Sequence, residues 1–375
     1  MLQKGKMMEK AESTISKSEN MLTGVDVLRL AASIAAVVLH SFLEFDRFAD
    51  LYVASILVRW LVPIFFLISG YFLKTDTKEF VKFMGRLILV YVVWTVIYAL
   101  LYGYNIWNPY DFASALRSGI VMPLWYYPTI IATLIFVWIL AKTVKKPGII
   151  ILIGAVLFIG ALIWNEFRYV PALAALQDSP VMMIHHKIFG EISSKGGLFW
   201  ATLFVAIGYG LRNCKDGIIF KIRASVNELF ASNNEVFGSG NESKGCEHAN
   251  ENLVKSRPGR KFWIILGVVF VLYAVEICVT NTFRAGDMDV LIMQIPFCTL
   301  LFIWALNCRI RKEFGIMLRG ISTIIYLSHY FFLDLIRPVT GTGLFLALGT
   351  AVASFAFGWI IVRLSQKITP LKWIY

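Results

Sequence analysis

Residues 24–45 decide the fold of this chain, and they read GVDVLRLAASIAAVVLHSFLEF. The run is apolar and long enough for a transmembrane helix, but Arg29 and His40 interrupt it. These two residues are eleven positions apart, which is close to three helical turns, so both project from the same side. Asp26 and Ser33 fall on that side as well. A polar stripe in a membrane helix must face a protein interior or a wet cavity, which makes it a candidate functional site.

The composition is that of an integral membrane protein. Of the 375 residues, 58% are hydrophobic and only 16% are charged. Apolar runs of about 20 residues recur along the chain, which predicts an all-α, polytopic membrane protein surrounded by a lipid bilayer. The net charge of +12 is concentrated in short connections between the runs. We therefore attribute it to membrane orientation and expect no nucleic-acid partner.

The apolar runs predict a bundle of about ten transmembrane helices. The predicted spans are 24–46, 51–73, 80–103, 124–144, 147–165, 196–211, 261–283, 288–306, 314–336 and 341–363. Lysine and arginine are enriched in alternate connections, which predicts that both termini are cytosolic. Residues 1–23 form a predicted cytosolic segment, and 24–375 form one membrane domain. Within that domain, the polar stretch 212–260 is predicted to be a mobile cytosolic insert.

Four ionisable residues on four predicted spans share one depth. The helical rise places His40, Arg59, Glu276 and His329 about 21 to 24 Å from the cytosolic ends of their spans. A charge at that depth costs roughly 2.5 kcal/mol or more, so these side chains are expected to satisfy one another as a cluster. The alternative is that Arg59 and Glu276 pair with each other or reach the membrane surface, which leaves the two histidines on their own.

A second, cationic layer is predicted nearer the cytosol. Arg29, Arg86 and Arg319 each lie one to two turns inside their spans, where they could receive the phosphates of an anionic cofactor. The alternative is that these side chains only extend toward lipid headgroups. The sequence contains no HExxH, serine-hydrolase elbow or P-loop motif, which disfavours a zinc site, a serine hydrolase and a Walker-type pump, and no metal is expected.

Several segments in order resemble the integral membrane acyltransferase family 3. Arg29 and His40 stand in the family's Arg-x10-His arrangement. Further segments that carry the resemblance are VPIFFLISGYFLK from 62, Arg86-Leu87 with Tyr91 and Trp94, PLWYYPTIIATLI from 123, GLFWATLFVAIGYGLR from 197 and STIIYLSHYFFL from 322. They extend from the first predicted span to the ninth. One departure is Pro123, which stands where the family commonly has a histidine before the Leu-Trp pair.

The resemblance implies a membrane-bound O-acyltransferase of the bacterial plasma membrane. Such an enzyme would transfer an acyl group, expected to be acetyl, from cytosolic acyl-CoA to a hydroxyl of an extracytoplasmic glycan, glycolipid or cell-wall acceptor. It also implies that Arg29 and His40 are essential. An alcohol needs a positioned base to attack a thioester, and His40 is the candidate, oriented by His329 or Glu276.

The remaining candidate residues are assigned to the two substrates. The donor is expected to contact Arg29, Arg86 and Arg319, with Ser69 and Tyr71 lining its channel. Arg29 is expected to bind either the CoA phosphates or the oxyanion that develops in the reaction. The acceptor is expected to contact Arg59, Trp125 and Tyr126. For Ser69 and Tyr71 the alternative is tight helix packing through the small Ser69-Gly70 pair.

A second function class stays open. The same membrane domain resembles the amino-terminal half of the membrane-bound serine racemases of vancomycin resistance, in particular through VPIFFLISGYFL. The alternative function is therefore a non-catalytic, serine-handling membrane domain, or a transporter.

Overall fold

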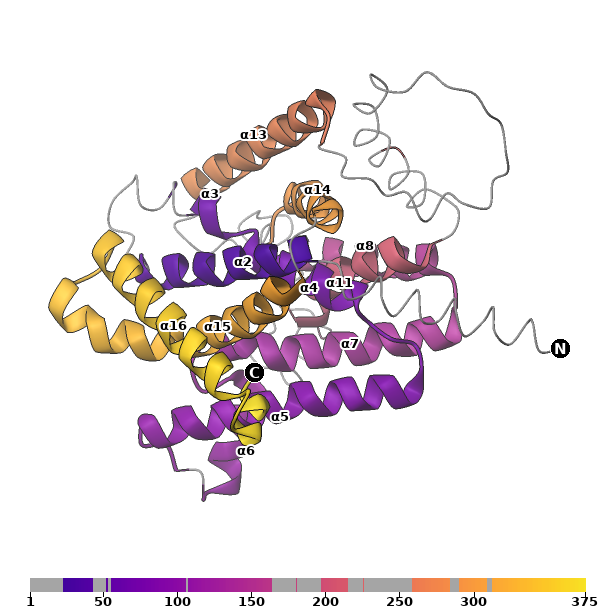
Figure 1. The fold of residues 1–375 in the computed structure, drawn as a ribbon. Coiled ribbons are helices and arrows are strands. Elements are labelled where there is room, and N and C mark those ends of the chain that lie inside the picture. Colours follow the sequence, from indigo (N-terminus) through magenta and orange to yellow (C-terminus); the bar gives the residue numbers. More distant parts are fainter. Residues whose placement is uncertain are drawn as a thin grey trace, which may run out of the picture.

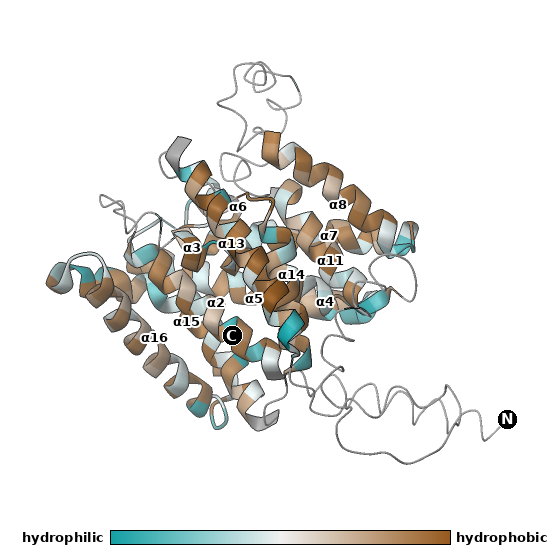
Figure 2. Cartoon of the chain, turned by 90° about the horizontal axis from the view of Figure 1, so that it is seen from above, coloured by the Kyte–Doolittle hydropathy of each residue, from teal (hydrophilic) through white to brown (hydrophobic). Residues whose placement is uncertain are grey.

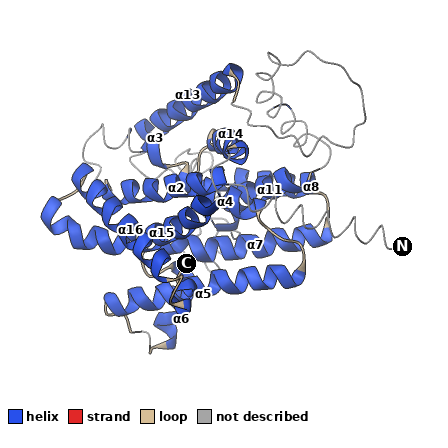
Figure 3. Ribbon diagram, viewed as in Figure 1, coloured by secondary structure: helices blue, strands red, loops and turns tan. Residues whose placement is uncertain are grey.

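The computed structural model describes residues 23–42, 52, 55–105, 107–163, 180, 197–214, 225, 258–283, 290–308 and 312–375. All regular secondary structure in these residues is helical, which confirms the predicted fold class (Figure 3). The predicted segment 1–23 and insert 212–260 lie almost wholly outside the described residues. Their predicted location and mobility stay predictions.

Most of the helices follow the predicted apolar runs, whereas α6 was not predicted by any of them (Figure 1). They are α2 (Thr23–Ser41), α3 (Ser55–Val58), α4 (Leu61–Tyr71), α5 (Thr77–Leu101), α6 (Pro109–Ser118), η2 (Met122–Trp125), α7 (Tyr126–Thr143), α8 (Pro147–Ala161), α11 (Gly197–Asn213), α13 (Arg260–Phe283), α14 (Gln294–Asn307), α15 (Lys312–Thr340), α16 (Leu344–Leu364) and η5 (Thr369–Trp373). In the described residues, six helices are long and apolar enough to cross a membrane. The chain is therefore a multi-pass membrane protein, whereas the number of ten spans and the sidedness of the termini stay predictions.

The second predicted span is not one continuous helix. It is divided into α3 and α4 by a turn at Arg59 and Trp60. The cause is Pro63, which has no N–H to donate to the Arg59 carbonyl four residues earlier. That carbonyl instead accepts a hydrogen bond of 3.1 Å from the Gln294 side chain, at the first position of α14. The hydrogen bond at the break therefore connects the turn before α4 with the start of α14.

Side-chain contacts fix the directions of neighbouring helices. Phe80, near the start of α5, stacks at 4.6 Å on Trp138, near the end of α7, so these two helices are antiparallel. Helices α2 and α15 are parallel, because Asp26 pairs with Arg319 near their starts and His40 meets His329 further along. Arg29 and Arg319 therefore lie at one end of the bundle, which we call the arginine end. Arg86 is linked to this end through Tyr375, whose main-chain oxygen it binds and whose ring lies beside Gly320 of α15.

Glycine brings α4 and α11 into close contact. A Cβ atom on Gly70 would collide with the carbonyl of Val205, and a Cβ on Gly208 would collide with the carbonyl of Leu67. Small residues that let backbones approach are typical of membrane helix interfaces. For Gly70 the packing interpretation is therefore confirmed, and α11 becomes the buried centre of one half of the bundle.

Apolar side chains cover the periphery of the bundle. Figure 2 shows the hydrophobic colour along α8 and α16, which lie at its edge. Helix α13 is the most exposed of the six long helices, with only 17% of its apolar window buried inside the protein. In contrast, α2 and α15 reach 61% and form the interior against which the site is built.

Candidate functional site

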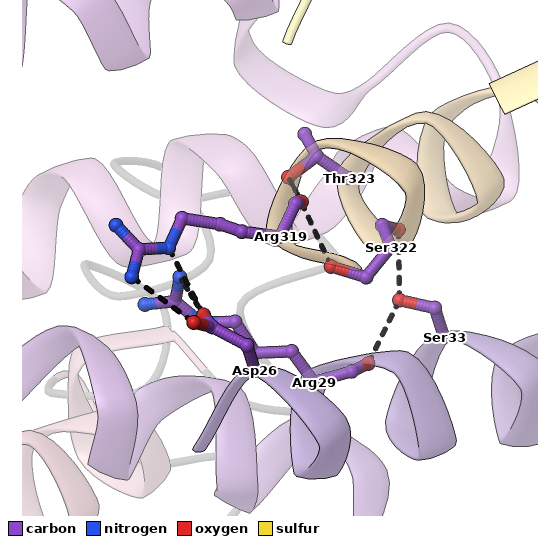
Figure 4. Close-up of polar contacts among 6 residues, drawn as sticks. All are labelled: Asp26, Arg29, Ser33, Arg319, Ser322 and Thr323. Carbon is purple, nitrogen blue, oxygen red and sulfur yellow. Dashed lines mark hydrogen bonds and ion pairs between the residues drawn. The ribbon is translucent and has the colours of Figure 1, made fainter. Parts of the chain in front are cut away.

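Asp26 forms the first polar contact between α2 and α15. Its carboxylate accepts hydrogen bonds from Arg319 at 2.9 Å and 3.1 Å, and Arg29 approaches it to 3.6 Å from the next turn of α2 (Figure 4). Asp26 is 3% exposed at its side chain, whereas Arg319 remains 49% exposed. Two arginines thus share one buried carboxylate, which leaves a net positive charge at the arginine end.

Ser33 forms the second contact, two turns further along α2. Its hydroxyl lies 2.8 Å from the Ser322 carbonyl of α15 and 3.0 Å from the Arg29 carbonyl of its own helix (Figure 4). The side chain is fully buried. Small residues at this level keep the two helices close, so the polar stripe predicted on α2 faces α15.

His40 and His329 form the third contact. Their rings stack with centroids 5.3 Å apart and an interplanar angle of 25°. His329 is fully buried, and His40 retains 8% exposure. The Nδ1 of His40 and the Nε2 of His329 have no hydrogen-bond partner in the described part of the chain. Buried polar atoms are rarely left in this state, so these two nitrogens are available to a ligand.

The hydrogen bond of His329 defines its tautomer. Its Nδ1 lies 3.1 Å from the carbonyl oxygen of Ile325, one turn earlier in α15. A carbonyl oxygen can only accept, so Nδ1 carries the hydrogen and Nε2 of the neutral ring holds a lone pair. The unpartnered nitrogen of His329 is therefore a proton acceptor.

A row of aromatic side chains connects the histidines with Ser69. Tyr326 lies 6.0 Å from His329 and 5.7 Å from Tyr126, measured between ring centroids. The Tyr126 hydroxyl is in turn 3.4 Å from the Ser69 hydroxyl. Tyr326 also donates a 2.9 Å hydrogen bond to the carbonyl of Pro123, so the position that departs from the family pattern contributes through its backbone.

The predicted donor-binding residues lie at the arginine end but differ in their surroundings. Arg29 is 21% exposed at its side chain and lies over the Phe72 ring at 5.5 Å. Arg86 is exposed and donates a 2.9 Å hydrogen bond to the main-chain oxygen of Tyr375. Tyr71 is covered by Arg212, whose guanidinium lies 5.8 Å from its ring. Arg29 is thus the one of these three whose side chain joins the Asp26 site.

Glu276 and Arg59 lie in a different corner of the bundle. The two carboxylate oxygens of Glu276 accept hydrogen bonds from the backbone N–H groups of Ile292 and Met293, at 2.8 Å and 2.7 Å. Glu276 therefore caps the start of α14, and Arg59 lies at the same helix through the bond of its carbonyl to Gln294. Among the described residues, the predicted cluster of four is thus divided: His40 lies with His329, whereas Glu276 and Arg59 lie at the start of α14. This division agrees with the alternative in which the two histidines are on their own.

Trp125 and Tyr126 lie at the junction of η2 and α7. Tyr126 stacks on Phe66 at 5.3 Å and is buried, and Trp125 packs at the edge of the main core. Tyr126 is itself part of the row that leads to His329. The predicted contact of Trp125 and Tyr126 with an acceptor stays a prediction.

Sequence reasoning passed over two polar residues beside the histidines. The Tyr330 ring lies edge-on to His40 at 6.1 Å, and Asp334 follows one turn later on α15. The signal was present, because Asp334 is a carboxylate inside the predicted span 314–336 and shares a helical face with Tyr330.

The site joins an anion-binding group to a base. A phosphate or another anion can bind at the arginine end, and the unpartnered imidazole nitrogens lie about 16 Å further along α2, given the helical rise over eleven residues. Within the described residues, no group of three or more side chains is arranged to hold a metal ion. The arrangement is chemically suited to proton removal from a substrate that is held in part by its negative charge.

Comparison with known proteins leads to a family. No solved structure shows a significant match to the chain. An amino-acid racemase from Enterococcus faecalis is 23% identical over 207 residues, which cover 52% of this chain and 28% of the racemase. The chain thus matches well under a third of that relative's length. The sequence profile of the acyltransferase domain of acyltransferase family 3 matches residues 22–363, nearly the whole chain. The chain therefore belongs to acyltransferase family 3.

Proposed function

We propose that this protein is a membrane O-acyltransferase that transfers an acetyl group from acetyl-CoA to a hydroxyl of an extracytoplasmic acceptor. Family membership supports acyl transfer in general. The observation that carries the proposal is the pair of stacked histidines with unpartnered nitrogens, on the same two helices as the arginine-bound carboxylate. The bacterial plasma membrane is the proposed location.

The proposed reaction uses the two ends of the α2–α15 pair for different tasks. Arg29 binds a phosphate of the donor at the arginine end, and the thioester reaches along α2 toward His40. An imidazole nitrogen removes the proton of the acceptor hydroxyl while its oxygen attacks the thioester carbonyl. The C–S bond then breaks, and the thiolate takes the proton back from the imidazolium. The products are an ester and CoA with a free thiol.

His329 supports His40 in this scheme. Its Nδ1 is held by the Ile325 carbonyl, so the ring cannot rotate freely, and it stacks on His40. The greater exposure of His40 makes it the base that meets the acceptor, and His329 is the positioning residue behind it. Arg29 is the main proposed contact of the donor, and Arg86, Arg319, Ser69 and Tyr71 are proposed as secondary contacts. Arg59, Trp125 and Tyr126 remain proposed contacts of the acceptor.

The test uses the full chain in lipid nanodiscs. CoA release from acetyl-CoA is followed with a thiol reagent, and CoA binding is measured by calorimetry. The His40→Gln variant should bind CoA with the affinity of the wild type. Its rate of forming free CoA from acetyl-CoA should be at least a hundredfold lower. Thr323→Ala, a substitution on the same helix as His329, is the control. The proposal is wrong if the wild type neither binds CoA nor releases it.

A serine-handling domain is the second candidate, because the matched relative is named as an amino-acid racemase. It predicts that L-serine binds to the nanodisc preparation and that acetyl-CoA does not. It also predicts that His40→Gln leaves serine binding unchanged. The same calorimetric titration, repeated with L-serine, separates the two functions.

A further inference from the structure

Residues 365–375 fold back onto the bundle after α16, and we call them the C-terminal strap. The strap includes η5 and lies beside α5 (Figure 1). No step of the reaction written above uses it. It nevertheless occupies Arg86, which is proposed as a secondary contact of the donor. The contacts of the strap therefore decide whether Arg86 is available to a ligand.

Two side chains of α5 hold the strap by its main chain. The guanidinium of Arg86 donates a 2.9 Å hydrogen bond to the main-chain oxygen of Tyr375. The indole N–H of Trp94 donates a 2.8 Å hydrogen bond to the main-chain oxygen of Ile374. Arg86 and Trp94 are eight positions apart, which is about 12 Å along the helix, whereas their acceptors belong to adjacent residues. The two side chains therefore converge on one point of the strap.

The ring of Tyr375 anchors the strap on the opposite side. Its hydroxyl lies 2.6 Å from Oγ of Ser365, which itself donates to the Val362 carbonyl, so Tyr375 is the donor. The ring also lies against Gly320 of α15, where an added Cβ atom would be only 3.1 Å from its Cε2. Because Gly320 directly follows Arg319, the strap lies between Arg86 on α5 and the part of α15 that carries Arg319.

Contact with lipid headgroups is the simpler explanation for the outer side of the strap. Ile368 and Trp373 are 48% and 59% exposed, and Lys367 and Lys372 are exposed as well. Tryptophan and lysine side chains are typical of a membrane interface. Lipid contact does not explain the inner side, where two side-chain donors of α5 are used by the main chain of the strap.

The bond between Arg86 and the strap competes with binding of an anion by the same guanidinium. A phosphate is a stronger acceptor than a main-chain carbonyl because it is charged. Arg86 is exposed, so a phosphate can approach it and exchange the two partners. We propose that the strap is an autoinhibitory latch, which keeps Arg86 from the donor until a donor phosphate displaces the main-chain oxygen of Tyr375. That the displacing ligand is CoA rests on the proposed function.

The first experiment measures CoA affinity by calorimetry, on the full chain in phosphatidylcholine nanodiscs. Tyr375→Ala removes the anchoring ring and should lower the Kd of CoA about fivefold, because a competent state that is rarely populated weakens the apparent affinity. Gly320→Ala adds a methyl group against the same ring and should act in the same direction. Gly267→Ala is the matched control on α13, where an added Cβ meets nothing within 4 Å, and should keep the wild-type Kd.

The second experiment asks whether the gain in affinity depends on Arg86. The double variant of Arg86→Ala and Tyr375→Ala should bind CoA within about twofold of Arg86→Ala alone, because the two substitutions act on one contact. Hydrogen exchange followed by mass spectrometry reports on the strap itself. CoA should accelerate exchange of the backbone amides of 365–375 in the wild type.

Each outcome supports or overturns the latch. Thermal unfolding and gel filtration check folding, and either Tyr375→Ala or Gly320→Ala decides alone if the other does not fold. A folded variant that binds CoA as the wild type does, or more weakly, overturns the latch and leaves the proposed function standing. If neither the wild type nor Tyr375→Ala binds CoA, both fail. If phosphatidylglycerol accelerates exchange of the strap without CoA, a lipid phosphate is the ligand of Arg86 and the donor latch is overturned.

Discussion

The α2–α15 pair and the α13–α14 pair both carry ionisable side chains inside predicted membrane spans, but these side chains have different partners. Between α2 and α15, Asp26 meets arginines and His40 meets His329, with nitrogen atoms left unpartnered. Between α13 and α14, both oxygens of Glu276 are consumed by backbone N–H groups. Equal depth along the membrane normal therefore says nothing about function. The free hydrogen-bonding capacity of a group is the better guide.

The difference has a structural cause. Four N–H groups at the start of a helix have no partner inside that helix, and α14 begins without a capping side chain of its own at Met293. A carboxylate on the neighbouring helix is the obvious acceptor. His40 lies near the end of α2, away from the unpartnered N–H groups of a helix start, and its ring faces the side chain of His329.

The comparison is tested most strongly by His40→Gln. Removal of a general base typically costs 10²–10⁴ in rate, so we expect about a 10³-fold lower rate of acetyl transfer, with unchanged CoA affinity. Single-turnover assays on nanodiscs measure the rate, and calorimetry measures the affinity. A variant with the wild-type rate would remove His40 from the reaction.

The next largest effect is expected at the arginine end. Arg29→Ala should raise the Kd of CoA by about 30-fold, which corresponds to about 2 kcal/mol. Arg319→Ala should instead lower the thermal stability, because the buried Asp26 carboxylate loses two hydrogen bonds. Equal losses of affinity in the two variants, at unchanged stability, would show that both arginines bind the donor. Calorimetry and thermal unfolding separate these effects.

A smaller effect is expected for Glu276→Gln. The amide retains one acceptor oxygen but loses the charge, so the variant should lose about 1.5 kcal/mol of stability through the start of α14. Activity per folded molecule should change by less than about twofold, since the histidine pair does not depend on this cap. A loss of activity comparable to that of His40→Gln, at wild-type stability, would restore the catalytic role that the sequence predicted.

The smallest effect is expected for Arg86→Ala. Its guanidinium is exposed and donates to the main-chain oxygen of Tyr375, so solvent screens its charge. The Kd of CoA should rise by no more than about threefold by calorimetry at physiological salt. A larger increase, abolished at high salt, would make Arg86 a main contact of the donor, as Arg29 is, and not a secondary one.

Much of the fold could be predicted from helical periodicity. The apolar runs predicted most of the described helices to within a few residues, but α6 (Pro109–Ser118) lies outside every predicted span, and α14 begins at Gln294, later than its predicted span 288–306. The spacing of Asp26, Ser33 and His40 predicted the face of α2 that meets α15. The break at Arg59 was missed because Pro63 was counted only as part of an apolar run. The partner that binds the Arg59 carbonyl left free by Pro63 is Gln294, which is far away in sequence and could not be predicted from the local pattern.

The candidate site could be predicted only in part. Depth in the membrane selected both the histidines and Glu276, because a one-dimensional coordinate cannot distinguish directions within the bundle. The family resemblance pointed to Arg29 and His40 but not to Asp26 as the group that Arg29 shares with Arg319. Tyr330 and Asp334 needed the neighbouring helices, since their importance comes from contacts with His40 and Tyr102.

The α2–α15 pair sets a length requirement for the donor. Arg29 and His40 both lie on α2, so the helical rise over eleven residues fixes the gap between them at about 16 Å. Contacts at three levels, separated by 293, 289 and 289 positions in sequence, would all be broken if one helix slid along the other by a turn, so Arg319 and His329 stay beside the two ends of that gap. A donor with its anionic groups at one tip of a long flexible arm and its thioester at the other can bridge that gap, whereas a compact donor such as acetyl phosphate is too short to reach both.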